Sequence, residues 1–75
     1  MTLQDIIKGK SYIIKSIATL DQALTSKVLA LGMIPGESIE LMHKAPLGDP
    51  MQIKSGSTYI SIRRKDGMCI EVDVI

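Results

Sequence analysis

Apolar and polar residues alternate along most of the second half of the chain. This period of two recurs in four stretches of strand length, residues 38–43, 51–54, 58–63 and 70–74. A fifth stretch, residues 12–17, is rich in β-branched residues but does not separate two faces cleanly. We predict a strand in each stretch, with these residues sharing the apolar faces: Ile39, Leu41 and His43; Met51 and Ile53; Ile60 and Ile62; Ile70, Val72 and Val74.

One stretch between the first and second strands has helical spacing instead. Its apolar residues recur at intervals of four and three, which places them on one stripe of a helix. The stripe consists of Leu24, Val28 and Leu31. Asp21 stands where an N-cap carboxylate accepts otherwise free amide protons, and Gly32 stands where a left-handed residue commonly ends a helix. We predict a helix over residues 21–31, with Lys27 beside the apolar stripe.

Short turns that contain glycine or proline separate the predicted strands. Residues 34–37, Ile-Pro-Gly-Glu, suit a type II turn because glycine takes the positive φ at low cost. Residues 45–50, APLGDP, are interpreted as a loop between two strands, and residues 55–57 as the next turn. Residues 64–69 fit either a tight Asp-Gly hairpin or a short helical turn.

Five short strands with one inserted helix are typical of a mainly β fold, a small five-stranded antiparallel barrel. Closure would remove the free edges that an open sheet exposes. We expect a single domain over residues 1–75 with an aliphatic core, because the chain has no Phe or Trp and only two Tyr. A domain of this size is marginally stable, so a protein partner or weak self-association would be an unsurprising source of stability.

The composition indicates a soluble, cytoplasmic protein. The single cysteine, Cys69, cannot form an internal disulfide, which fits a reducing compartment. No apolar run reaches the roughly 18 residues of a membrane span. Residues 1–10 also lack the apolar region of a signal peptide. The net charge is +1 with scattered signs, so composition alone does not call for a polyanionic partner.

Few residues are candidates for catalysis or metal binding. His43 and Cys69 could form a catalytic pair, but this interpretation is much less well supported than the alternative. In the alternative, His43 is a polar residue at the end of a strand and Cys69 is a small apolar residue. Glu71 and Asp73 share one strand face, which is normally solvated, whereas transition-metal sites draw on three or four ligands. A weak hard-cation site on these carboxylates would leave no sequence pattern. We predict no catalytic residue, no cofactor and no metal site.

Nucleic-acid binding is an alternative that rests on one basic cluster. Residues 63–65, Arg-Arg-Lys, form this cluster, and small five-stranded barrels often bind oligonucleotides. Single-strand binding usually adds aromatic stacking to positive charge, and this chain has only two tyrosines. We therefore expect no nucleic-acid partner. The APLGDP loop is also a poor phosphate cradle, because it has one glycine and leads into a strand.

Three segments carry a recognisable combination of motifs. They are LALGMIPG at residues 29–36, APLGDP at residues 45–50 and ISIRR at residues 60–64. Together they resemble the FeoA family of small ferrous-iron transport proteins, over residues 10–74. The resemblance implies an SH3-like barrel, a cytoplasmic location and a supporting role for FeoB, the membrane GTPase that moves ferrous iron. A related barrel is the C-terminal domain of iron-dependent repressors, which begin with a helix-turn-helix domain. Residues 1–10 are too short for such a domain.

The resemblance leads to the hypothesis of a non-enzymatic accessory domain that binds the cytosolic part of FeoB. The alternative role, activation of GTP hydrolysis, would need an arginine finger, for which only Arg63 and Arg64 are available. The family often carries Arg where this chain has Lys27, which lacks the bidentate guanidinium. For the glycines and prolines of these motifs, the competing explanation is that they only fix the backbone geometry and do not contact a partner. The expected contact residues are Lys27, Gly32, Met33, Ile34, Pro35, Leu47, Gly48 and Asp49.

Overall fold

The computed structural model describes residues 1–75 and contains the five strands and the helix that the sequence predicts. The residues left open between a hairpin and a helical turn form a helical turn. No helix has the length and apolar character needed to cross a bilayer. In chain order the elements are η1 (Leu3–Asp5), β1 (Ser11–Ile17), α1 (Gln22–Ala30), β2 (Ser38–Lys44), β3 (Met51–Ser55), β4 (Thr58–Ile62), α2 (Arg64–Gly67) and β5 (Ile70–Val74).

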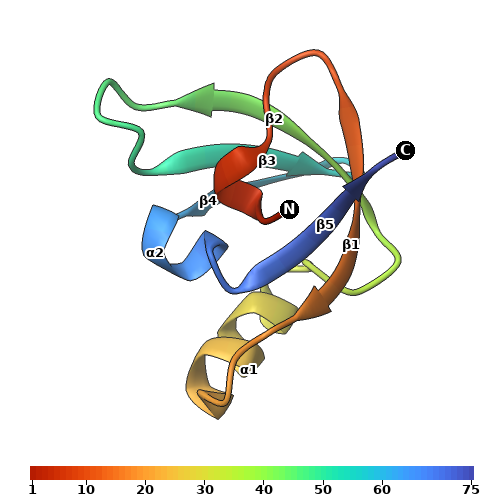
Figure 1. Ribbon diagram of the computed structural model, residues 1–75, viewed down its shortest axis with the longest axis vertical. Helices are drawn as coiled ribbons and strands as arrows, with labels where there is room; N and C mark the ends of the chain where they lie inside the picture. The colour runs from red at the N-terminus through yellow and green to blue at the C-terminus, as the bar shows by residue number, and fades with distance from the viewer.

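The strands form one antiparallel sheet in the order β4-β3-β2-β1-β5. The sheet is strongly bent, so that β1 and β5 run steeply across β2, β3 and β4 (Figure 1). The mainly β fold is therefore confirmed. The expectation that closure removes every edge is wrong, because no ladder joins β4 to β5 and α2 connects them instead. The result is a partly open barrel.

The first residues of the chain cover the outer edge of β5. Thr2 forms an isolated antiparallel bridge with Glu71, and the N–H of Val72 donates to the carbonyl oxygen of Met1 at 2.9 Å. These contacts satisfy backbone groups that an edge strand would otherwise present to other chains. The N-terminal segment thus covers part of the edge of β5 that a neighbouring strand would cover in a closed barrel.

Two shifts of register explain where simple alternation fails. Along β1 the pairing with β5 shifts between Ile14 and Ser16, so Lys15 is an extra residue, as at a β-bulge. Along β2 the pairing with β3 shifts in the same way between Leu41 and His43. Ile14 and Leu41 are buried, whereas His43 is exposed. The prediction that His43 shares the apolar face of β2 is therefore wrong, because the extra residue turns the strand end outward.

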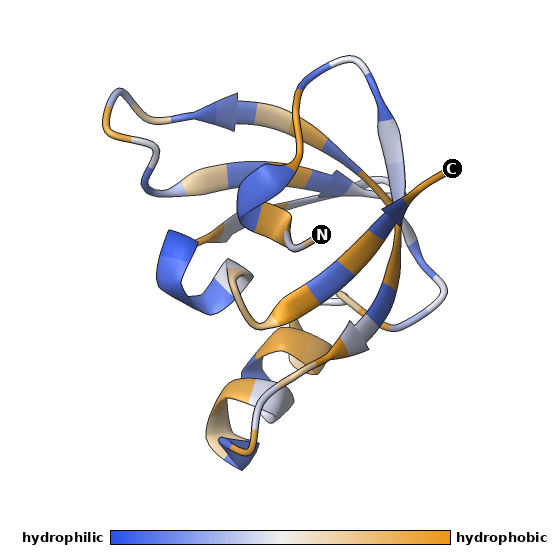
Figure 2. Cartoon of the chain, in the orientation of Figure 1, coloured by the Kyte–Doolittle hydropathy of each residue, from blue (hydrophilic) through white to orange (hydrophobic).

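One aliphatic core fills the space inside the bent sheet. The strands alternate between hydrophobic and hydrophilic residues as they pass over it (Figure 2). From α1, Val28 is fully buried, while Leu24 and Leu31 are partly buried and pack against the core, as the helical stripe predicts. The buried apolar cluster consists of Leu3, Ile6, Tyr12, Ile14, Val28, Met33, Ile39, Leu41, Met51, Ile53, Ile60, Ile62, Ile70 and Val72.

Two members of the core, Leu3 and Ile6, come from a segment to which the sequence assigned no structure. The segment turns as η1, where the N–H of Thr2 donates to the Asp5 carboxylate at 2.9 Å. It lies beside β5 and α2 (Figure 1). A Cβ on Gly67 would stand 3.2 Å from the Cβ of Leu3, so the absence of a side chain there lets η1 approach α2 closely. Residues 1–6 therefore close the open side of the barrel.

Two adjacent isoleucines give a matched test of this packing. Ile6 is fully buried, whereas Ile7 is 53% exposed. Ile6→Ala should lower the free energy of unfolding by about 2–5 kcal/mol, because buried methyl groups are lost and a cavity remains. Ile7→Ala should change it by less than about 0.5 kcal/mol. Urea titrations followed by circular dichroism measure both values. Equally small losses in the two variants would show that this segment is not part of the core.

Candidate partner-binding site

The C-terminal end of α1 is fixed by a Schellman motif. Gly32 has φ of 95°, its N–H donates to Leu29 O at 3.0 Å, and the N–H of Met33 donates to Val28 O at 3.2 Å. At the other end the Asp21 carboxylate accepts from the amides of the first turn, as the sequence predicts. The helix is therefore well terminated at both ends.

The turn that follows the helix is pinned to β1. Gly36 has φ of 96°, and the N–H of Glu37 donates to Ile34 O at 3.0 Å, as expected for the predicted type II turn. Gly36 N–H also donates to Ile14 O at 2.8 Å, and Ile14 N–H donates to Glu37 O at 3.0 Å. These bonds hold Ile34, which is 49% exposed, and the exposed Pro35 in fixed positions on the surface.

The APLGDP loop presents one leucine to solvent. Leu47 is 90% exposed at its tip. The N–H of Gly48, which has φ of 81°, donates to Ala45 O at 2.7 Å, and Ala45 N–H donates to Pro50 O at 3.2 Å across the base of the loop. The peptide bond between Asp49 and Pro50 is cis. The loop is thus a closed turn whose apolar tip packs against nothing in the chain.

Asp49 ties this loop to α2. Its Oδ1 accepts a hydrogen bond of 3.0 Å from the backbone N–H of Arg64, which is the first residue of α2. The N-cap residue of α2, Arg63, makes no side-chain capping bond, so Asp49 supplies an acceptor that α2 lacks locally. The base of the loop is therefore fixed by a contact between segments 15 residues apart.

The expected contact residues fall into two patches rather than one. The loop patch, Leu47, Gly48 and Asp49, and the turn patch, Gly32, Ile34 and Pro35, lie at well-separated ends of the molecule (Figure 1). Lys27 lies on the exposed side of α1. It pairs with Asp66 of α2 at 3.4 Å and shares a polar hollow of about 270 Å³ with Asp49 and Arg63. Lys27 thus belongs with the loop patch.

Met33 needs a correction. Met33 is 0% exposed and belongs to the same apolar core cluster as Val28. The Schellman motif turns this residue inward, because the chain reverses direction at Gly32. In this fold Met33 is a core residue and offers no side chain to a partner.

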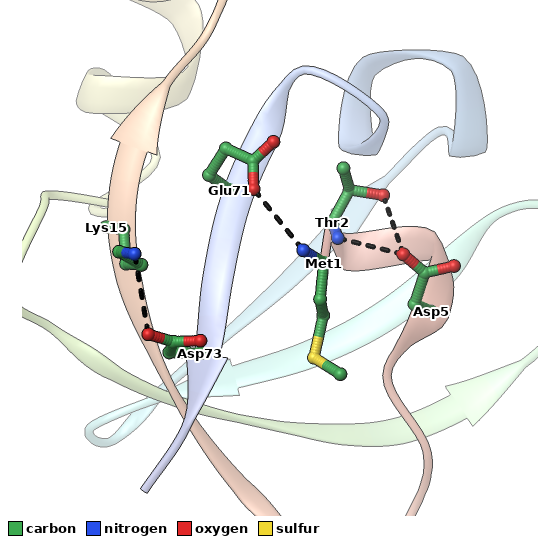
Figure 3. Close-up of polar contacts among 6 residues, drawn as sticks. All are labelled: Met1, Thr2, Asp5, Lys15, Glu71 and Asp73. Carbon is green, nitrogen blue, oxygen red and sulfur yellow. Dashed lines mark hydrogen bonds and ion pairs between the residues drawn. The ribbon is translucent and has the colours of Figure 1, made fainter.

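The paired carboxylates of β5 each face a cation rather than one another (Figure 3). Glu71 Oε2 lies 3.4 Å from the N-terminal amine of Met1, and Asp73 Oδ2 lies 3.5 Å from Lys15 Nζ. No group of three His, Cys, Asp or Glu side chains is placed to hold a metal ion. These carboxylates therefore act as surface ion-pair partners, a role that contributes little stability.

The two candidates for nucleophilic catalysis lie in different surroundings. His43 lines a shallow groove with Ile7 and Leu41, whereas Cys69 is a half-buried free thiol between α2 and β5. No hydrogen bond joins the two side chains. Tyr12 is buried, and Tyr59 is exposed on β4 with Lys54 Nζ 5.9 Å from its ring centre, so the chain offers one exposed ring rather than the several that stack successive bases.

The match to a family model decides the relationship of this chain to known proteins. The model of the FeoA domain matches residues 1–74. The chain belongs to the FeoA family. A relative in Porphyromonas gingivalis is named an Fe(2+) transport protein A/Fe(2+) transporter FeoB fusion protein, and it is 35% identical over 49 residues. The aligned part is 65% of this FeoA-family chain but 6% of the fusion protein.

Solved structures agree with the fold. The solution structure of iron(II) transport protein A from Clostridium thermocellum is 36% identical to this FeoA-family chain and has a TM-score of 0.92. The alignment includes all of this chain and 46% of the other. The crystal structure of Stenotrophomonas maltophilia FeoA, complexed with zinc and described as an SH3 domain protein, is 26% identical with a TM-score of 0.83. That comparison covers 97% of this chain and 89% of the other. The predicted SH3-like fold is therefore confirmed.

The contact between Asp49 and α2 can be tested by two substitutions. Asp49→Ala should lower the free energy of unfolding by about 1 kcal/mol, because the first N–H of α2 loses its acceptor. Asp49→Asn keeps an acceptor oxygen and should retain most of that stability. Thermal unfolding of the two variants measures the difference. If both substitutions cost the same, the hydrogen bond to Arg64 is not what holds the loop.

Proposed function

We propose that this FeoA-family protein is a non-enzymatic accessory protein of ferrous iron uptake. In this proposal it acts in the cytoplasm by binding the cytosolic region of a FeoB-type membrane GTPase. The observation that carries the proposal is the fusion protein of Porphyromonas gingivalis, whose name combines Fe(2+) transport protein A with the FeoB transporter. Fusion keeps two modules at a high effective concentration, which favours modules that work in contact.

The surface of the molecule supports binding by small, rigid contact points. Leu47 stands at the tip of a closed loop, and Ile34 stands on a turn that is hydrogen-bonded to β1. Because these side chains are already held in place, a partner that covers them loses little conformational entropy on binding. The loop patch is the stronger candidate, since Leu47 is almost completely exposed and Lys27 and Asp49 line a hollow at its base.

A second candidate role, activation of GTP hydrolysis, rests on two arginines. Arg63 and Arg64 are exposed, and their guanidinium groups form no ion pair or hydrogen bond within the chain. Such groups are free to reach into the nucleotide site of a partner and stabilise transition-state charge there. This role would make the protein a regulator of turnover rather than only of assembly.

One experiment separates the two roles. The purified protein is mixed with the cytosolic region of the FeoB-type transporter of the same genome, and binding is measured by calorimetry with GDP, with a GTP analogue and without nucleotide. GTP turnover is measured in parallel, and both assays are repeated with full-length transporter in membranes. Binding without faster turnover supports the accessory role, and faster turnover supports GTPase activation. Failure to bind at high micromolar concentration in every format would reject both roles.

Substitution of Leu47 tests directly whether the APLGDP loop contacts the partner in this binding assay. Leu47→Ser should weaken binding about tenfold or more, because an apolar side chain that is buried in a contact contributes on the order of 1.5–3 kcal/mol. It should leave the unfolding temperature nearly unchanged, since the side chain is 90% exposed. Leu20→Ser is the matched control, because Leu20 is also fully exposed but stands before α1, outside both patches. If the two variants bind equally, the loop is not the contact.

A further inference from the structure

A strip of positive charge surrounds the base of the APLGDP loop. Three shallow hollows adjoin one another there, and two of them share Lys27 and Arg63 as lining residues. The third is lined by Gly48 and Arg64, which are the chain neighbours of Asp49 and Arg63 in the other hollows. We call the cationic residues of these hollows the basic strip: Lys27, Lys44, Arg63, Arg64 and Lys65. The strip gathers five of the nine Lys and Arg residues of a chain whose net charge is only +1.

The carboxylates in these hollows are all engaged inside the chain. Asp66 pairs with Lys27 at 3.4 Å and its side chain is only 14% exposed. Asp21 accepts from two amides of α1, and Asp49 accepts from the N–H of Arg64. Each of these carboxylates therefore already accepts from a donor inside the chain. The three carboxylates offset three of the five positive charges, so the strip and its carboxylates together keep a net charge of +2.

Three of the cations have no partner of their own. The side chains of Arg63, Arg64 and Lys65 are exposed and form no ion pair and no hydrogen bond within the chain. All three belong to the N-cap and first residues of α2, which is among the most hydrophilic segments in Figure 2. α2, α1 and the β2–β3 loop lie along the same side of the molecule (Figure 1). The unpaired charge is thus concentrated on one side.

One hollow beside the strip is also lined by a neutral residue, Gln4. Gln4 lines the hollow that also contains Lys44 and Arg64, and its side-chain oxygen Oε1 is buried without a hydrogen-bond partner. Because this oxygen is buried, a ligand bound in the hollow does not reach it, and Gln4 contributes only to the wall of the hollow. The accessible cations Lys44 and Arg64 therefore set the chemistry of the hollow, which favours a negatively charged ligand.

We propose that the basic strip is the docking site for an acidic segment of the partner's cytosolic region. The proposal rests on the proposed function and names the chemistry of the contact. A polypeptide with Asp and Glu side chains supplies carboxylates that pair with the exposed guanidinium and ammonium groups of the strip, and the proposed function requires a protein partner. The strip also has no exposed aromatic ring to stack a base.

The test uses charge reversal within the strip and a matched reversal outside it. Arg63→Glu/Arg64→Glu removes the two exposed guanidinium groups, and Lys8→Glu/Lys10→Glu makes the same change in net charge in the exposed turn before β1. Binding of each variant to the purified cytosolic region of the FeoB-type transporter is measured at 50 and 300 mM NaCl. Arg63→Gln/Arg64→Gln is a second, milder variant, and thermal unfolding checks that each variant is folded.

We expect the wild type to bind at least tenfold more tightly at 50 than at 300 mM NaCl, since salt screens exposed charges. The Arg63/Arg64 reversal should weaken binding at low salt tenfold or more, the glutamine variant should weaken it less, and the Lys8/Lys10 reversal should change it less than threefold. Equal binding by all variants, with no salt dependence, would overturn the docking site and leave the accessory function standing. A wild type that does not bind at all would instead reject the function on which the proposal rests.

A parallel experiment with lipid vesicles tests whether the strip binds a negatively charged membrane surface instead of an acidic protein segment. Vesicles of phosphatidylcholine and phosphatidylglycerol are sedimented with the wild type and with the Arg63/Arg64 reversal. No retention on these vesicles is the expected result. Retention of the wild type that the reversal abolishes, together with unchanged binding to the transporter region, would overturn the proposal in favour of a membrane surface.

Discussion

The small aliphatic core of this protein must be enclosed from every side by only 75 residues. No Phe or Trp is available, so the enclosed volume is filled by branched and thioether side chains together with Tyr12. A sheet buries only one face by itself, and this sheet therefore bends over the core while other segments cover what remains open. η1 covers one side through Leu3 and Ile6, α1 contributes Val28, and the turn after α1 contributes Met33.

The need for enclosure also explains which parts of the fold were predictable. The four strands β2 to β5 were, because each is half-buried and its alternation of apolar and polar residues reports this directly. β1 was predicted from its β-branched residues instead, and the prediction that Val74 shares the apolar face of β5 is wrong, because this residue at the strand end is 51% exposed. The N-terminal cover was not, because two buried side chains within six residues have no period. The exposure of His43 depends on a register shift against β3, which is a property of the strand pair and not of β2 alone.

The candidate site shows the same division between local and long-range information. Gly32, Gly36 and Gly48 were assigned to turns correctly, since a positive φ is a local requirement. Sequence could not show that Met33 points inward, or that the loop and the turn lie apart. It also could not show that scattered charges from residues 27, 44 and 63–65 meet around one loop. The apparent neutrality of the chain conceals an asymmetric surface.

The attachment of α1 has a consequence for how the molecule moves. Only one residue of this helix, Val28, is fully buried, and one ion pair joins its exposed side to α2. Segments with little buried apolar surface generally open at a lower free energy than the global unfolding transition, so local opening of α1 is expected to cost less than opening of the sheet. The APLGDP loop, by contrast, is closed on itself and bonded to α2. The two neighbouring segments are therefore held differently, α1 mainly by the side chain of Val28 and the loop by hydrogen bonds of its own backbone and of Asp49.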